Sequence, residues 1–121
     1  KRSAGKTITF KKKNIKVKNL ESYDFSNAKI TIFAAGSAIA KKWAPIAAKK
    51  TIIIDNSKHF RMEKDIALVV PEVNEDALKI YKKKKIIANP NCSTAQLVLV
   101  LKPLHEKFQI QQHLIDVQNE L

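Results

Sequence analysis

Short apolar runs separated by polar turns repeat along most of the chain. Runs of β-branched and other apolar residues over three to eight positions are typical of strands, above all of strands covered on both faces. The predicted strands are Ile30–Phe33, residues 51–54, residues 68–70, Ile86–Ala88 and residues 110–117. Two further short segments, Thr7–Phe10 and residues 15–17, flank a lysine-rich turn at residues 11–14 and predict a hairpin.

Helical patterns lie between these strands. They cover residues 38–49, Glu75–Ile80 and residues 92–101. Pro45 is expected to kink the first helix or to mark a restart, and Pro103 to end or bend the last. Strands that alternate with helices at this spacing predict an α/β fold with a mostly parallel sheet and crossover helices.

A mostly parallel sheet also predicts where a ligand binds. Such sheets bind ligands beyond the carboxyl ends of their strands. Turn-rich segments lie at three of these predicted ends, residues 34–37, 55–57 and 89–92. The pattern therefore predicts the location of a site, although it says nothing of the chemistry.

Composition narrows the classes of protein. The 121 residues are 45% hydrophobic, which is enough for one compact core, and the longest apolar runs are far too short to cross a bilayer. A membrane partner is therefore not expected. The single cysteine excludes an internal disulfide and favours a reducing, cytoplasmic setting.

The net charge of +12 allows two interpretations. Lysines gather in residues 1–18, which contain no acid, and in residues 82–85. Such runs attract anions, including nucleic acid, but they also occur as solvated turns that keep a small domain soluble. Phe10 is the one aromatic residue in these runs, so they lack a series of interleaved aromatic residues for base stacking, and nucleic acid is not the expected partner.

Cys92 is the residue with the clearest chemical potential. It follows a predicted strand and a proline turn and stands in the first turn of a predicted helix, where Asn91 or Ser93 can cap. Free N–H groups and the positive dipole end there favour a thiolate, which can attack a carbonyl or an acyl phosphate. A lone cysteine that serves as a small buried hydrophobe is the alternative.

Several motifs around Cys92 resemble the aspartate-semialdehyde dehydrogenase family. They occur in order from residue 1 to about residue 103: Lys1-Arg2-Ser3-Ala4-Gly5-Lys6, Ala44-Pro45-Ile46-Ala47, Asp55-Asn56-Ser57 with His59-Phe60-Arg61-Met62, Val69-Val70-Pro71-Glu72-Val73-Asn74 and Asn89-Pro90-Asn91-Cys92-Ser93-Thr94 with Gln96. The related N-acetyl-glutamyl-phosphate reductases usually have glycine before the cysteine and an aromatic residue after it. Asn91 and Ser93 therefore favour the semialdehyde enzyme.

The resemblance implies a reaction and roles for individual residues. The family uses NADPH to convert β-aspartyl phosphate to aspartate β-semialdehyde and releases phosphate, in the biosynthesis of lysine, diaminopimelate, threonine and methionine. Cys92 would form the acyl thioester, and Arg61 would grip the acyl phosphate through its planar fork of donors. Asn91 would orient the substrate beside the thiol. An exposed loop arginine and a simple helix-capping asparagine are the alternatives.

The resemblance also implies an NADP site on a Rossmann-like sheet. Arg2 and Ser3 would receive the adenosine 2′-phosphate, Gly36 would let the cofactor approach the backbone, and Asn56 would lie near the nicotinamide amide. The alternatives are a terminal charge, a turn glycine and a capping asparagine. No metal is expected, since His59, His105 and His113 have no ligand-like spacing, although His59 stands within one of the motifs.

The resemblance implies a division of the chain and several departures from the family. Residues 1–91 would be part of the NADP-binding domain, and residues 92–121 the start of the catalytic and dimerisation domain of a homodimeric or homotetrameric enzyme. The family's glycine-rich pyrophosphate turn would precede Lys1, and its base histidine would follow Leu121, so the 121 residues alone are expected to be an inactive fragment or remnant. Ala34, Ser37 and Ala40 replace an expected serine, glycine and serine beside the nucleotide.

Overall fold

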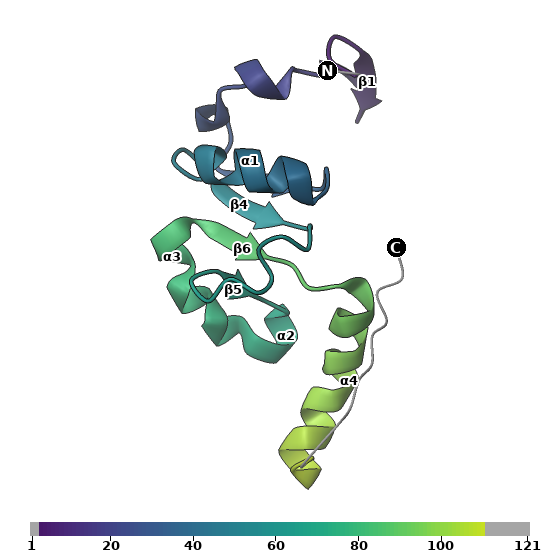
Figure 1. Cartoon of the computed structure of the whole chain (residues 1–121). Coiled ribbons are helices and arrows are strands. Elements are labelled where there is room, and N and C mark those ends of the chain that lie inside the picture. Colours follow the sequence, from purple (N-terminus) through teal and green to yellow (C-terminus); the bar gives the residue numbers. More distant parts are fainter. Residues whose placement is uncertain (1–2, 111–121) are drawn as a thin grey trace.

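A four-stranded parallel sheet organises the molecule. The computed structural model describes residues 3–110. The sheet has the order β3-β4-β6-β5, formed by Ile30–Phe33, Ile52–Asp55, Ile86–Ala88 and Ala67–Leu68, and every neighbouring pair is parallel (Figure 1). The predicted parallel sheet with crossover connections is therefore confirmed.

The helices connect these strands or extend beyond them. The α-helices are α1 (Ser37–Ala47), α2 (Pro71–Asn74), α3 (Tyr81–Lys84) and α4 (Cys92–Phe108), and the 3₁₀ segments are η1 (Leu20–Ser22), η2 (Phe25–Asn27) and η3 (Glu75–Ile80). Figure 1 shows α1 lying across the strands, whereas α4 extends away from the sheet. Among the described residues, no helix combines the length and the apolar character that a membrane crossing requires.

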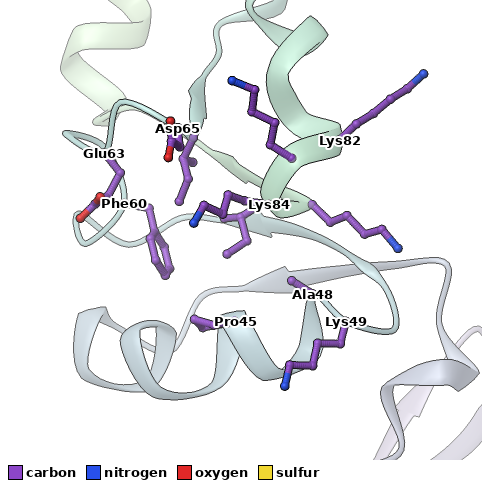
Figure 2. A pocket seen from close by; sticks show the side chains of 12 residues that line it. Pro45, Ala48, Lys49, Phe60, Glu63, Asp65, Lys82 and Lys84 are labelled. Carbon is purple, nitrogen blue, oxygen red and sulfur yellow. The ribbon is translucent and has the colours of Figure 1, made fainter.

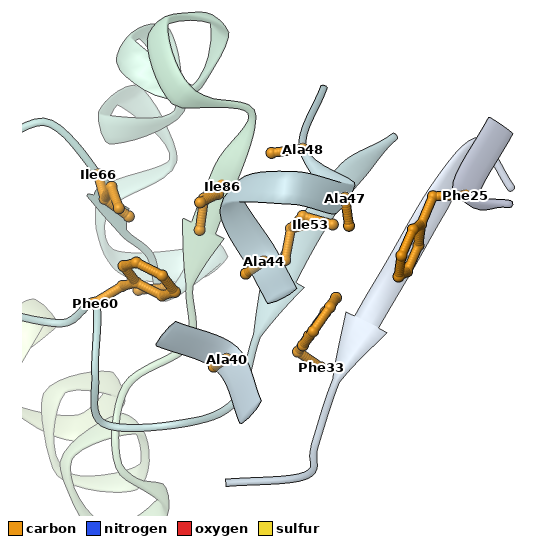
Figure 3. Close-up of a cluster of buried hydrophobic side chains, with 11 residues drawn as sticks. Phe25, Phe33, Ala40, Ala44, Ala47, Ala48, Ile53, Phe60, Ile66 and Ile86 are labelled. Atoms are coloured by element: carbon orange, nitrogen blue, oxygen red, sulfur yellow. The ribbon is translucent and has the colours of Figure 1, made fainter. Parts of the chain in front are cut away.

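The core lies between α1 and the sheet. Ala40, Ala44 and Ala47 recur at helical spacing and are all buried on the face of α1 that meets Ile53, which is 0% exposed (Figure 3). Alanine side chains are short, so the helix backbone can approach the strand closely. Burial of this apolar face stabilises the sheet and fixes the positions of its strand ends.

The predicted hairpin exists, but its turn is shorter than expected. β1 (Thr7–Phe10) pairs antiparallel with β2 (Lys13–Lys16), so the second strand begins two residues before the predicted start. The turn consists of Lys11 and Lys12, whose φ angles are 47° and 62°. Two positive φ angles are typical of the type I′ turn, which matches the twist of the strands it joins.

Three other expectations about elements are met in part, wrong or fall outside the described residues. Neither helix ends at its proline, since α1 and α4 continue through Pro45 and Pro103, where good helix formers stand on both sides. A kink or bend at these prolines stays a prediction. β5 covers Ala67–Leu68 and not residues 68–70, because Pro71 begins α2. Ile110 is not in a strand, and residues 111–117 of the last predicted strand lie outside the described residues.

Candidate functional site

The carboxyl ends of β3, β4 and β6 lie side by side. Phe33, Asp55 and Ala88 are register partners at the last position of each strand. The ladder continues one residue further, since the Asn56 N–H donates to the Phe33 carbonyl at 2.8 Å and the Asn89 N–H to the Asp55 carbonyl at 2.8 Å. The turns that follow these strands are therefore held together at one edge of the sheet, as the pattern predicted.

Arg61 ties two of these turns to each other. Its Nε donates to the carbonyl oxygen of Asn89 at 3.0 Å, and its Nη2 donates to the carbonyl oxygen of Asn56 at 3.5 Å. The side chain is only partly exposed. Arg61 is thus not a free loop arginine, because it connects the turn after β4 with the turn after β6.

A side-chain pair joins the same turns. The Asn89 Nδ2 donates to the Asn56 Oδ1 at 2.7 Å, and both side chains are exposed. Asn56 and Asn89 are 33 positions apart in the sequence, and it is the parallel pairing of β4 with β6 that brings them together. The bond uses one amide hydrogen of Asn89 and none of Asn56, so the other amide hydrogens can donate to a ligand or to water.

A buried carboxylate supports the loop after β4. Asp55 is 0% exposed, and its Oδ2 accepts from the Ser57 hydroxyl at 2.7 Å. The Ser57 Oγ in turn accepts from the His59 N–H at 3.2 Å. The other oxygen of Asp55 has no hydrogen-bond partner among the described residues. This chain of contacts fixes the beginning of the loop that carries Arg61.

Cys92 is a free, exposed thiol on the first residue of α4. Asn91 is the N-cap, and its Oδ1 accepts from the Ser93 N–H at 2.8 Å. The preceding Pro90 is buried. The predicted position of the cysteine at the head of a helix is confirmed, and the alternative of a cysteine that serves as a small buried hydrophobe is wrong for this structure.

Gly36 stands at the N-cap of α1 with a φ of 86°. This conformation favours glycine because a Cβ would be strained there. A Cβ at this position would meet no atom within 4 Å, so no protein atom of the described residues fills the space beside the turn. The turn therefore explains the glycine, and the open space leaves room for a ligand to approach the backbone.

The remaining cofactor-side residues are divided. Ser3 is exposed at the base of the hairpin, where its carbonyl accepts from the Lys6 N–H at 3.1 Å, and Arg2 lies outside the described residues. Ala34 is exposed and Ser37 is half-buried near the turn, whereas Ala40 is buried in the core. The expectation that Ala40 alters the nucleotide surface is therefore wrong, because its methyl group lies on the buried face of α1.

A cleft lies apart from these residues. It measures about 510 Å³ and is bounded by the end of α1, the loop around Phe60, α3 and the first residue of β6, Ile86. Its lining contains none of the predicted site residues. Figure 2 shows that Lys84 extends over this cleft whereas Lys82 points away. These lysines do not converge on one point, so the cleft provides no argument for the nucleic-acid interpretation.

Comparison with known proteins agrees with this geometry. Residues 1–81 match the family model described as "Semialdehyde dehydrogenase, NAD binding domain". The chain belongs to this family. Aspartate-semialdehyde dehydrogenase 2 of Vibrio cholerae is 48% identical over 111 residues, which are 91% of this chain and 33% of that protein. The chain thus spans about a third of the length of the curated relatives it matches.

Solved structures of semialdehyde dehydrogenases share the fold. The crystal structure of aspartate semialdehyde dehydrogenase II from Vibrio cholerae, complexed with ASA, has a TM-score of 0.83 and 49% identity, covering 87% of this chain and 35% of that one. The enzyme from Candida albicans, solved with NADP, has a TM-score of 0.70 and 31% identity, covering 90% and 38%. The Rossmann-like fold expected from the motifs is therefore confirmed.

Sequence reasoning on this semialdehyde dehydrogenase chain missed two positions. Asn89 stands in a quoted motif but received no role, and Asp55 was treated only as turn chemistry. An acid directly after a run of three isoleucines was the available signal for Asp55. Asn89 had no such signal, because its partners are distant in sequence. The described residues hold no group of three or more His, Cys, Asp or Glu side chains suited to a metal ion.

Proposed function

We propose that this chain is the NADP-binding part of an aspartate-semialdehyde dehydrogenase and carries the nucleophile Cys92. The observation that supports this most directly is the exposed thiol at the start of α4, three residues after Asn89, whose carbonyl is held by Arg61. Family membership and relatives named for this enzyme give the reaction class. The substrate would be an acyl phosphate, β-aspartyl phosphate.

The thiol chemistry follows from the place of Cys92. Its thiolate would attack the acyl carbon and form a C–S bond while the C–O bond to phosphate breaks, and phosphate leaves with the electron pair. NADPH, when bound, would supply a hydride to the thioester carbon, and the C–S bond would break to release the aldehyde and the Cys92 thiolate. The N–H groups of the first turn of α4 would stabilise the oxyanion in both steps. Asn91 caps this turn and would keep those donors oriented toward the substrate.

Arg61 is suited to hold the phosphate. A guanidinium carries five N–H donors, and its bonds to the Asn89 and Asn56 carbonyls use Nε and one Nη2 hydrogen. The remaining donors can pair with phosphate oxygens without giving up these contacts. The two carbonyls would thereby orient the guanidinium before the substrate arrives, which lowers the cost of binding.

The cofactor would lie along the carboxyl ends of β3 and β4. The open space over Gly36 fits a nucleotide that passes close to the backbone, and the exposed Asn56 amide fits a carboxamide partner. Arg2 and Ser3 would receive the 2′-phosphate. Residues 1–91 would then form the cofactor domain and residues 92–121 the start of the catalytic domain, in a cytoplasmic homodimer or homotetramer. The only cysteine of the 121 residues is free and exposed, which suits a reducing compartment.

Alkylation of Cys92 by a neutral and an anionic reagent tests this proposal. Iodoacetamide is expected to react faster with the chain than with a small free thiol at pH 7. Iodoacetate is expected to react relatively faster still, because the Arg61 charge attracts the carboxylate, and Arg61→Ala should lower the ratio of the two rates by about two- to tenfold. Cys92→Ser is the blank. A wild-type rate no higher than that of the free thiol contradicts the nucleophile role.

A further inference from the structure

We propose that Asn89 is a positioning residue that couples the turn after β4 to the turn that carries Cys92. The proposal rests on the proposed function, since it concerns the environment of the nucleophile. Asn89 stands first in the motif that contains Cys92, and the resemblance to the family implies no role for it. Its importance follows from its contacts, because Asn89 uses its N–H, its carbonyl and its side chain on three different residues.

The three contacts join Asn89 to one neighbouring segment. Its N–H donates to the Asp55 carbonyl at 2.8 Å, its carbonyl accepts from the Arg61 Nε at 3.0 Å, and its Nδ2 donates to the Asn56 Oδ1 at 2.7 Å. Asp55, Asn56 and Arg61 all belong to the end of β4 and the loop after it. Asn89 is therefore the point at which the segment carrying Cys92 is attached to the segment carrying the anion-binding arginine.

The short connection to Cys92 transmits this attachment. Only Pro90 and Asn91 separate the two residues. The ring of Pro90 fixes its φ, and Pro90 is buried. Asn91 is held by its capping bond to the Ser93 N–H at 2.8 Å. Because both intervening residues are restrained, a shift of Asn89 moves the first turn of α4 instead of being absorbed between them.

If Asn89 had a purely structural role, its substitution would lower the melting temperature. The Asn89 and Asn56 side chains are exposed, so water can replace their mutual bond at little cost to stability. The core that holds the fold, around Ile53 and Ala44, lies elsewhere. Loss of the Asn89 amide should therefore leave melting almost unchanged, whereas the geometry around the thiol changes.

Asn89→Ala in the 121-residue chain tests the proposal, with Asn74→Ala as the matched control. Asn74 is also an exposed asparagine whose side chain makes two bonds, to the Val70 N–H and the Leu68 carbonyl, at the end of another strand. The rate of Cys92 alkylation by iodoacetamide is expected to fall about tenfold in Asn89→Ala, within the hundredfold or so that a misplacement of about 1 Å can cost. The control should keep the wild-type rate.

Three further variants separate positioning from general destabilisation. Asn56→Ala removes the other half of the pair, so it should lower the rate as much as Asn89→Ala, and the double variant should be no slower than either single one. Asn89→Asp should restore most of the rate, because the Asn56 amide can turn and donate to the carboxylate.

The outcomes test two separate claims, the positioning role of Asn89 and the nucleophile role of Cys92. An Asn89→Ala rate equal to or above that of Asn74→Ala overturns the positioning role, as do additive effects of the Asn56 and Asn89 substitutions. These comparisons are made between variants and do not depend on the absolute wild-type rate. A slow wild-type thiol would instead contradict the proposed function, and the Asn89 effect would still be measured.

Discussion

The two long helices of the molecule differ in how they are held. α1 and α4 both contain an internal proline, and α4 is the longer, with 17 residues against 11. α4 has a side-chain cap from Asn91, whereas Gly36 gives α1 none. Yet α1 buries three alanines on the sheet, and α4 buries no residue and contacts α2. Capping thus defines where a helix begins, while burial decides how firmly it is fixed.

Cys92 lies at the boundary between the part of the chain that is packed in the sheet and the poorly buried helix α4. It is preceded by turns that the sheet holds in register and followed by a helix on which several apolar side chains, including Val100 and Phe108, are exposed. The position of the thiol is consequently set from the side of the sheet. This difference makes the Asn89 contacts more important for the thiol than anything further along α4.

The largest expected effect separates the two regions by stability. Ile53→Ala should lower the free energy of unfolding by about 2–5 kcal/mol, because it leaves a cavity between α1 and the sheet. Val100→Ala, at a position that is 61% exposed, should change it by less than about 0.5 kcal/mol. Urea denaturation measures both. Similar losses at the two positions would contradict the comparison.

A medium effect should be confined to α4. Asn91→Ala removes the cap and should weaken the helix by about 1 kcal/mol. Amide hydrogen exchange should accelerate in the first turns of α4 while β4 and β6 keep their protection, because local opening follows local contacts. Asn91→Ser, which can also cap, serves as the control. Faster exchange throughout the sheet would show that the two regions are not separate.

The smallest effect concerns acid stability at the edge of the core. The Ser26 hydroxyl and N–H donate to the Asp24 carboxylate, and with Lys50 they hold the pKa of Asp24 below its ordinary value of 3.8, although burial opposes them. Because the folded pKa is the lower one, this contribution is complete above the unfolded pKa and is lost as the pH falls through the folded pKa. Asp24→Asn keeps an acceptor for the N–H. Its melting temperature should therefore change less than that of the wild type below about pH 4; equal slopes would contradict this role.

Strands with strong local signals could be predicted from the sequence almost to the residue. Ile30–Phe33 and Ile86–Ala88 were found as such, because β-branched runs flanked by turns have few alternatives. The ends of helices were harder. Pro103 suggested an end or a bend. The helix does not end there, because one missing hydrogen bond is outweighed by good helix formers on both sides.

The location of the candidate site and the position of Cys92 could be predicted, but the hydrogen bonds between the site residues could not. Cys92 was placed correctly because a helix start after a proline turn is a local property. The bonds of Asn89 to Asn56 and Arg61 depend on the register of β4 against β6, which no local pattern encodes. The ligand roles of Arg61, Asn91, Gly36, Asn56 and Ser3 remain predictions, as does that of Arg2.

The tight turn between β1 and β2 offers positions at which substitution can raise thermal stability. Lys11 and Lys12 both adopt left-handed backbone angles that asparagine and glycine accept far more readily. A variant library built at these two positions should accordingly be enriched in Asn-Gly when it is selected for heat resistance alone. The native pair of lysines marks a spot where protein engineers can gain thermal tolerance without touching the strand ends of the parallel sheet.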